Sequence, residues 1–359
     1  MIMETKLIYI EDSEHITDDM LLEAAGIIRG GGLVAFPTET VYGLGTNALN
    51  EEAAKKIYAA KGRPSDNPLI AHIASMEELV PLVAEIPAAG RKLAAAYWPG
   101  PLTMVFPKSG KVPYGTTGGL ETVAVRMPSH PLARKLIALA GVPIAAPSAN
   151  LSGRPSPTRA EHVWQDMNGR IDLVIDGGAV GIGVESTIVD MSGEVPTLLR
   201  PGAITLEMLK DVIGGVEIDP AILGPLSEDV KPKAPGMKYR HYAPKAELVL
   251  VENTEVDNTV TENMVLEINR LATEQLQQGY QVGILCTDET RDRYPQGTVR
   301  SVGRRDSEQD VAHNLFAVLR EFDDLAVDYI FSESFPQDHL GQAIMNRLMK
   351  AAGYHIIKV

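Results

Sequence analysis

The stretch LVAFPTETVYGLG, residues 33–45, places a short apolar run directly before a segment of hydroxyls, one carboxylate and glycines. Leu33 to Phe36 predicts a buried strand, and the residues after it predict a loop whose glycines let backbone approach a ligand. A helical pattern at 51–61 and a second apolar run at 69–73 come next. The succession of strand, helix and strand indicates an α/β fold.

Farther along the chain, apolar runs follow one another with few helical patterns between them, at 102–106, 122–127, 144–146, 173–175 and 187–190. Such crowding favours a mixed sheet over a purely parallel one. Prolines at 220, 225, 232, 235 and 244 then interrupt any periodicity, as in a semi-extended linker. We predict a first domain at 1–213, a linker at 214–245 and, from alternating strand and helix patterns, a smaller parallel α/β domain at 246–359.

The composition limits the classes of function. The chain has 33 Lys and Arg against 47 Asp and Glu, a net charge of −14, which argues against a general polyanion-binding protein. Any nucleotide site must therefore be a local basic pocket. The single cysteine, Cys286, excludes a disulfide framework or a cysteine zinc site within the chain. Because no run of about 18 apolar residues occurs, we expect no membrane contact and a cytoplasmic protein.

The segment KGRPSDNP, residues 61–68, is a candidate phosphate site. Gly62 and Pro64 should end the preceding helix and stiffen the loop, which holds Lys61 as a point charge and Arg63 as a planar fork. Cations also suit the last turn of any helix, so the two interpretations stay open here. Gly43 to Ala48 fits the dinucleotide pattern G-x-G-x-x-A weakly, because the place of its acidic residue, about 20 positions on, falls in the loop at 65–68.

Three later segments carry polar or charged groups. Residues 146–153, APSANLSG, offer neutral hydrogen bonds to a nucleotide, although the same residues form ordinary turns. Residues 185–190, ESTIVD, precede Arg200, which is either an exposed fixed cation or a solvated surface arginine. The basic segment 231–245 holds two tyrosines among Lys, Arg and His, which favours a segment lying over an anionic ligand against a merely solvated linker. No P-loop, H-E-x-x-H or G-x-S-x-G motif occurs.

Together and in this order, residues 61–64, 147–153, 185–187, 199–202 and 241–244 resemble the threonylcarbamoyl-adenylate synthases of the YrdC family, in the longer two-domain form. The resemblance spans the chain. It implies a YrdC-like twisted open mixed sheet around a concave basic cavity, followed by a Rossmann-like parallel α/β domain. It also implies that L-threonine, bicarbonate and ATP give threonylcarbamoyl-AMP and diphosphate, for modification of tRNA next to the anticodon.

The same resemblance implies roles for individual residues. Thr38, His72, Arg126 and Ser186 should bind threonine, with its carboxylate near Arg126 and its ammonium near the hydroxyls. Lys61 and Arg63 are the expected catalytic cations. The expected ATP site comprises Lys61, Arg63, Ser65, Thr122, Ser148, Asn150, Ser156, Arg200, Tyr239 and Tyr242, with the tyrosines closing the linker over the nucleotide. Mg²⁺ should arrive with ATP, because it prefers phosphate oxygens and water, and no dedicated protein metal site is expected.

Three rival interpretations predict other behaviour. Binding of double-stranded RNA through its phosphates is opposed by the net charge of −14. A carbamoyl-adenylate-forming maturation enzyme of the hydrogenase type would need cysteine zinc fingers, which Cys286 alone cannot supply. A nicotinamide-dependent oxidoreductase would use Gly43 to Ala48. The expected partners are ATP, L-threonine and bicarbonate, and contact with tRNA or a downstream threonylcarbamoyl-transferase is left open.

Overall fold

The computed structural model describes residues 3–12, 15–222, 224, 232–235, 237, 241–253 and 262–359. The chain forms two compact units, and neither is continuous in sequence. The first comprises Met1–Ser152, Ser156–Gly181 and Glu185–Lys238, and the second comprises Gly153–Pro155, Ile182–Val184 and Tyr239–Val359. Two tripeptides that interrupt the sequence of the first unit therefore belong to the second unit. The predicted boundaries at 213 and 245 stay predictions.

The first unit is built on a sheet of eleven strands in the described residues, in the order β1-β8-β2-β3-β7-β4-β6-β5-β9-β10-β11. The strands are β1 (Lys6–Tyr9), β2 (Val34–Phe36), β3 (Gly43–Asn47), β4 (Ile70–His72), β5 (Leu102–Pro107), β6 (Thr122–Arg126), β7 (Ile144–Ala145), β8 (Leu173–Asp176), β9 (Thr187–Asp190), β10 (Thr197–Arg200) and β11 (Glu217–Ile218). Parallel pairs such as β4 with β6 alternate with antiparallel pairs such as β5 with β6. The prediction of a mixed sheet is confirmed.

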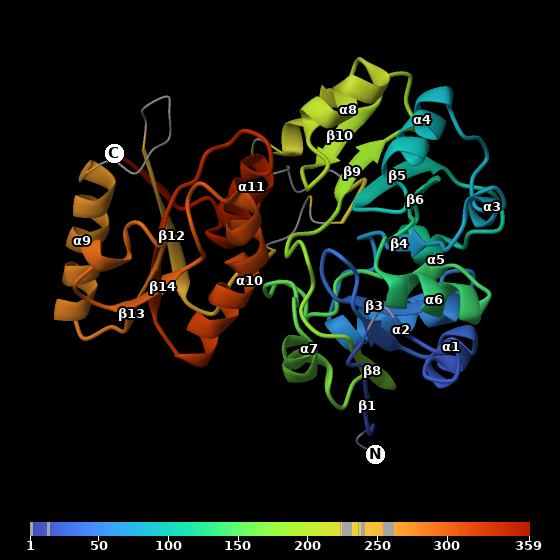
Figure 1. The fold of residues 1–359 in the computed structure, drawn as a ribbon, viewed down its shortest axis with the longest axis horizontal. Helices are drawn as coiled ribbons and strands as arrows, with labels where there is room; N and C mark the ends of the chain where they lie inside the picture. The colour runs from blue at the N-terminus through green and yellow to red at the C-terminus, as the bar shows by residue number, and fades with distance from the viewer. Residues whose placement is uncertain are drawn as a thin grey trace. The chain divides into compact units, whose positions relative to one another are not determined.

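Helices cover this sheet (Figure 1), and three apolar clusters are buried in the described part of the first unit. The helices are α1 (Leu22–Arg29), α2 (Glu51–Lys61), α3 (Met76–Leu79), α4 (Ala88–Tyr97), α5 (Tyr114–Thr117), α6 (Pro131–Ala140), α7 (Ala160–Met167), α8 (Leu206–Ile213) and the 3-10 turn η1 (Pro220–Ile222). Helix α2 has the bounds that the sequence predicts. Its first turn is capped by Asn50, whose side chain accepts from the Ala53 N–H, and it ends at Gly62, which adopts the left-handed conformation.

Strands β2 and β3 form an antiparallel hairpin in which Val34 lies opposite Gly45. A Cβ on Gly45 would lie 2.6 Å from side-chain atoms of both Ile144 and Phe36, so this glycine permits close packing of strands. The prediction of a loop through residue 45 is therefore wrong for Gly43 to Gly45. The hairpin also excludes the dinucleotide fingerprint at Gly43 to Ala48, because that fingerprint needs a turn from a strand into a helix.

The second unit holds a five-stranded parallel sheet, ordered β14-β13-β15-β12-β16, and the predicted parallel α/β fold is confirmed. Its elements are β12 (Glu247–Glu252), α9 (Glu262–Gln277), β13 (Val282–Cys286), the 3-10 turn η2 (Arg291–Arg293), β14 (Thr298–Ser301), α10 (Glu308–Asp324), β15 (Tyr329–Glu333), α11 (Gly341–Ala351) and β16 (Ile356–Lys358). Helix α9 covers one face of the sheet and α10 and α11 the other (Figure 1). Within the described residues, no helix combines the length and the apolar character needed to cross a membrane.

Helix α10 contacts both tripeptides, 153–155 and 182–184, that belong to the second unit. The buried guanidinium of Arg320 donates from Nε and Nη2 to the Pro155 carbonyl, at 3.1 and 2.7 Å. Asp323 forms an ion pair with Arg154 at 3.1 Å. Gly183 has a φ of 92°, and a Cβ there would lie 2.4 Å from the Ala312 carbonyl oxygen. Only glycine fits this position, since both the backbone conformation and the space exclude a side chain.

Candidate active site

Arg126 is the central side chain of the candidate threonine site. It ends β6, where His72 of β4 and Thr103 of β5 are its partners in register. Side chains of residues paired across neighbouring strands point to the same face of a sheet. His72, Thr103 and Arg126 therefore lie in a row across three strands, although they are far apart in sequence.

Thr38 and Thr40 shape the turn between β2 and β3. The two hydroxyls are 2.9 Å apart, and Thr40 Oγ1 accepts a hydrogen bond from Arg126 Nη1 at 2.9 Å. The Thr38 hydroxyl donates to the Val41 carbonyl at 2.7 Å and accepts from the N–H groups of Thr40 and Val41. The turn is thus fixed by its own hydrogen bonds and is joined to the end of β6.

Ser186 joins the row from its other side. Its hydroxyl lies 2.8 Å from that of Thr103 and accepts from Arg200 Nη2 at 3.2 Å. Arg200 also donates from Nε to the Ser186 carbonyl at 3.0 Å, and it is 5% exposed. The sequence predicted an exposed Arg200, as a fixed cation or as a solvated surface arginine, and both predictions of exposure are wrong because the side chain is buried against Ser186. The structure therefore brings Thr38, His72, Arg126 and Ser186 into one connected group that also includes Arg200.

His72 is a buried neutral imidazole in this group. Its Nδ1 lies 3.1 Å from the Ile70 carbonyl and 3.3 Å from the Ile144 carbonyl, so Nδ1 carries the proton and Nε2 is left as an acceptor. Burial, together with the charge of Arg126, lowers the pKa of His72 to about 3. Such a weak base is poorly suited to remove a proton from an ammonium group at neutral pH.

Glu39 belongs to the site and was given no role from the sequence. Its Oε1 lies 2.8 Å from Arg126 Nη2, and the two side chains are 13% and 5% exposed. Burial acts to raise the pKa of Glu39, but Arg126 together with the backbone N–H groups of Glu39 and Ser129 outweighs it, and the pKa lies below its usual value. The sequence did contain a signal, because Glu39 is an acid between two threonines in a turn expected to face a ligand.

Lys61 lies at the end of α2 and is 2% exposed. Its ammonium group donates to the backbone carbonyls of Ser148 and Asn150, both at 2.5 Å. The Ser148 hydroxyl donates to the Asn150 side-chain oxygen, also at 2.5 Å. Lys61, Ser148 and Asn150 therefore form a second group, in which one cation is surrounded by small neutral groups.

The remaining candidate ATP residues differ in their surroundings. Arg63 is 9% exposed and donates to the carbonyls of Asn67 and Pro68, at 3.3 and 3.1 Å. Ser65 in the same loop is exposed. Thr122 begins β6, so it lies about 13 Å along the strand from Arg126 and is not part of that group. Ser156 is buried and donates to Glu185 Oε1 at 2.5 Å.

Of the two linker tyrosines, the structure describes only Tyr242. Tyr239 lies outside the described residues. Tyr242 belongs to the second unit, where its ring stacks on Phe316 with centroids 5.2 Å apart and the Arg347 guanidinium lies 5.8 Å from the ring centre. The predicted contact of either tyrosine with a nucleotide stays a prediction.

Backbone contacts of the β2–β3 hairpin bring several predicted segments together. The N–H of Leu44 donates to the Pro147 carbonyl, and the N–H of Ala149 donates to the Tyr42 carbonyl. The N–H of Tyr42 donates to the Pro157 carbonyl. One hairpin of the first unit therefore joins three segments: its own turn with Thr38 and Thr40, the Ser148–Asn150 loop and the loop that carries Ser156.

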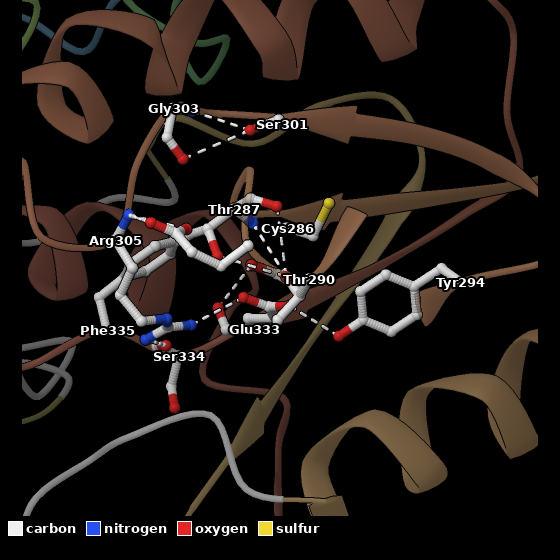
Figure 2. Close-up of polar contacts among 12 residues, drawn as sticks. Cys286, Thr287, Thr290, Tyr294, Ser301, Gly303, Arg305, Glu333, Ser334 and Phe335 are labelled. Atoms are coloured by element: carbon white, nitrogen blue, oxygen red, sulfur yellow. Dashed lines mark hydrogen bonds and ion pairs between the residues drawn. The ribbon is translucent and has the colours of Figure 1, made fainter. Parts of the chain in front are cut away.

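A second buried polar group lies at the carboxyl ends of β13 and β15 in the second unit (Figure 2). Glu333 is fully buried and accepts from the Tyr294 hydroxyl and from Arg305 Nη2, both at 2.7 Å. Arg305 also donates from Nη1 to the Ser334 carbonyl at 3.0 Å, and its guanidinium lies 5.1 Å from the centre of the Phe335 ring. Burial and the charge of Glu333 raise the pKa of Tyr294.

Known proteins resemble this chain over nearly its whole length. A family model described as telomere recombination matches residues 26–202, and one described as the C-terminal domain of threonylcarbamoyl-AMP synthase matches 204–353. The threonylcarbamoyl-AMP synthase of Pyrococcus abyssi is 51% identical over 352 residues, covering 98% of this chain and 99% of that protein. The enzyme of the same name from Bacillus subtilis is 48% identical over 359 residues, covering 99% and 100%. The crystal structure of P. abyssi Sua5 complexed with L-threonine superposes with a TM-score of 0.92 at 50% identity, covering 99% and 100%.

Proposed function

The chain belongs to the threonylcarbamoyl-AMP synthases, and from this premise we propose that it joins L-threonine, bicarbonate and ATP in the first unit. The observation that carries the proposal is the grouping of Arg126, Ser186 and Arg200 beside the hairpin that also contacts the Ser148–Asn150 loop, to which Lys61 donates. One group suits an amino acid, and the other suits the phosphates of a nucleotide.

Two bond-forming steps make the product. The threonine amine, once it has lost a proton, attacks the carbon of CO2 derived from bicarbonate and gives a carbamate and a second proton. A carbamate oxygen then attacks the α-phosphorus of ATP, and the bond to the leaving diphosphate breaks. No covalent intermediate with the enzyme is needed.

Both reacting partners in the second step are anions, so their repulsion is the main barrier that the protein must lower. We propose that Lys61, Arg63 and Arg200 neutralise the phosphates while Ser148, Asn150 and Ser156 supply uncharged hydrogen bonds. Ser65, Thr122 and the linker tyrosines Tyr239 and Tyr242 complete the proposed nucleotide site. Mg²⁺ is proposed to arrive on ATP as part of the substrate.

The product is proposed to serve tRNA modification in the cytoplasm, by contact either with tRNA or with the transferase that consumes the adenylate. None of the three rival classes gains support. The hairpin at Gly43 to Gly45 removes the basis for nicotinamide chemistry, the net charge of −14 opposes general RNA binding, and a single cysteine cannot form the zinc fingers of a hydrogenase-type maturation enzyme.

Mass spectrometry of the products tests the proposal. The purified full chain is incubated with ATP, bicarbonate, Mg²⁺ and one of several amino acids, with threonine, serine and valine as the first set. We expect the mass of an amino-acid carbamoyl-AMP, together with diphosphate, with threonine and not with valine. Diphosphate release without any such adduct, or equal yields from all three amino acids, would contradict the proposed reaction or its substrate.

A further inference from the structure

The Arg126–Glu39 pair lacks the hydrogen bonds that buried charges normally make. Arg126 Nη2 and Glu39 Oε1 form an ion pair at 2.8 Å, and the backbone N–H groups of Glu39 and Ser129 also favour the charged carboxylate. Among the described residues, however, Arg126 Nε and Nη2 and the two carboxylate oxygens of Glu39 make no hydrogen bond of good geometry. Because most buried polar groups are hydrogen-bonded in folded proteins, such a pair indicates a place for a ligand with both donors and acceptors.

The charges of the pair select the kind of ligand. A phosphate or a simple carboxylate would be attracted by Arg126 but repelled by Glu39. An α-amino acid carries a carboxylate and an ammonium on one carbon and has no net charge, so it complements a neighbouring cation and anion. Its carboxylate accepts from Arg126, and its ammonium donates to Glu39, each through charge-assisted hydrogen bonds.

The hydroxyls near the pair are less suitable acceptors for an ammonium group. The Thr38 hydroxyl already makes four contacts within its own turn, and Thr40 Oγ1 accepts from Arg126. Ser186 Oγ accepts from Arg200. His72 offers Nε2, but its ring is neutral. Glu39 is the one carboxylate that pairs with Arg126 among the described residues, and it supplies the full negative charge that an ammonium group favours.

We propose that Glu39 binds the α-ammonium group of threonine while Arg126 binds its α-carboxylate. The proposal rests on the proposed function and changes the expected partner of the ammonium from the hydroxyls to Glu39. It makes Glu39 a specificity-determining residue, because a ligand without an α-ammonium would leave this carboxylate unpaired beside a second anion.

The test compares threonine with 3-hydroxybutanoate, the same molecule without its amino group. Thermal-shift titrations of the full chain reach the high concentrations that a weak ligand needs. For Glu39→Gln, we expect the Kd of threonine to rise roughly ten- to a hundredfold and the Kd of 3-hydroxybutanoate to change less than about threefold. Glu52→Gln removes the same charge at an exposed position on α2 and should change neither Kd.

A different result would assign Glu39 another role. If Glu39→Gln weakened both ligands equally, Glu39 would only hold Arg126 in place. If it changed neither, Glu39 would lie outside the threonine site, and both outcomes would overturn the proposal. Circular dichroism and ATP binding of the variant check that it is folded. An unmodified chain that failed to bind threonine would contradict the proposed function instead, so the two failures are distinguishable.

Discussion

Among the described residues, each unit has a largely buried Arg–Glu pair near the ends of its strands, and the hydrogen bonds of the two pairs differ. In the second unit, both oxygens of Glu333 accept aligned hydrogen bonds, from Tyr294 and Arg305 (Figure 2). In the first unit, neither oxygen of Glu39 does so among the described residues, although Arg126 is equally close. The difference lies in the carboxylate, because the protein supplies partners for both oxygens of Glu333, whereas Arg305 Nε lacks a partner among the described residues just as Arg126 Nε does.

This difference separates a structural pair from a binding pair. A buried carboxylate whose two oxygens are both hydrogen-bonded rigidifies a fold and offers no acceptor to a ligand. A pair with unused donors and acceptors is costly until a ligand completes it, at about 1–3 kcal/mol for each unsatisfied group. The Arg305–Glu333 pair should therefore matter for stability, and the Arg126–Glu39 pair for substrate binding.

The largest loss of turnover is expected when Lys61 or Arg63 is removed. The hydrogen bonds described for these two cations go to backbone carbonyls, which do not neutralise the positive charge. Lys61→Ala and Arg63→Ala should each lower turnover roughly ten- to a thousandfold, the scale of a lost electrostatic stabiliser. Diphosphate release from ATP, threonine and bicarbonate measures the rate. Lys56→Ala is the matched control, because Lys56 lies on the same helix and also donates to a carbonyl, that of Gly31. Full activity in both site variants would remove these cations from the mechanism.

A smaller effect is expected when each arginine of the two pairs is changed to lysine, which keeps the charge but loses the planar fork. Arg126→Lys should raise the KM for threonine about ten- to a hundredfold and leave the KM for ATP within about twofold. Arg305→Lys should leave both KM values unchanged while the second unit loses about 1–3 kcal/mol of stability. Hydrogen exchange in β15 and α10 reports that loss. The comparison fails if Arg305→Lys raises the threonine KM as much as Arg126→Lys does.

The smallest effect concerns pH. Because the pKa of His72 is lowered to about 3 in the folded protein, only the unfolded chain binds its proton between about pH 6.5 and pH 3. This histidine should therefore lower stability as pH falls through that window, by at most about 1.4 kcal/mol for each pH unit. Relative to His72→Gln, the wild-type protein should lose about 1–2 kcal/mol between pH 6.5 and pH 5.

Urea unfolding followed by tryptophan fluorescence measures the pH effect in the first unit alone. The chain has two tryptophans, Trp98 and Trp164, and both belong to that unit. A difference between wild type and His72→Gln that stays constant from pH 7 to pH 5 would show that His72 is not held neutral beside Arg126.

Local signals explain what sequence could predict. The start and end of α2 depend on neighbouring residues alone: Asn50 caps its first turn, Gly62 ends it, and the apolar residues between them have helical spacing. The predicted bounds therefore match the structure. The motif residues around Thr38, Arg126 and Ser186 could be expected in one site only through a family resemblance. Thr40 and Arg126 are separated by 86 positions, and no pattern within one window joins them.

Other features could be recognised only once the order of the strands in the sheet was known. Gly43 and Gly45 suggest a ligand loop when read alone, because Ile144, which packs closely against Gly45, lies on β7, far along the chain. Glu39 was missed for the same reason, since its importance comes from Arg126 beside it. The non-contiguous second unit could not be predicted either, because Gly183 gives no sequence sign that α10 packs against it.

The contact between Arg320 and Pro155 also sets an order of events during synthesis. The two residues are separated by 165 positions, and chains grow at about 5–20 residues per second. The Pro155 carbonyl therefore leaves the ribosome roughly ten to thirty seconds before its guanidinium partner exists. For most of that interval, nascent chains carry tripeptides 153–155 and 182–184 without the helix that later packs on them. A chain released too early, before α10, never acquires that packing.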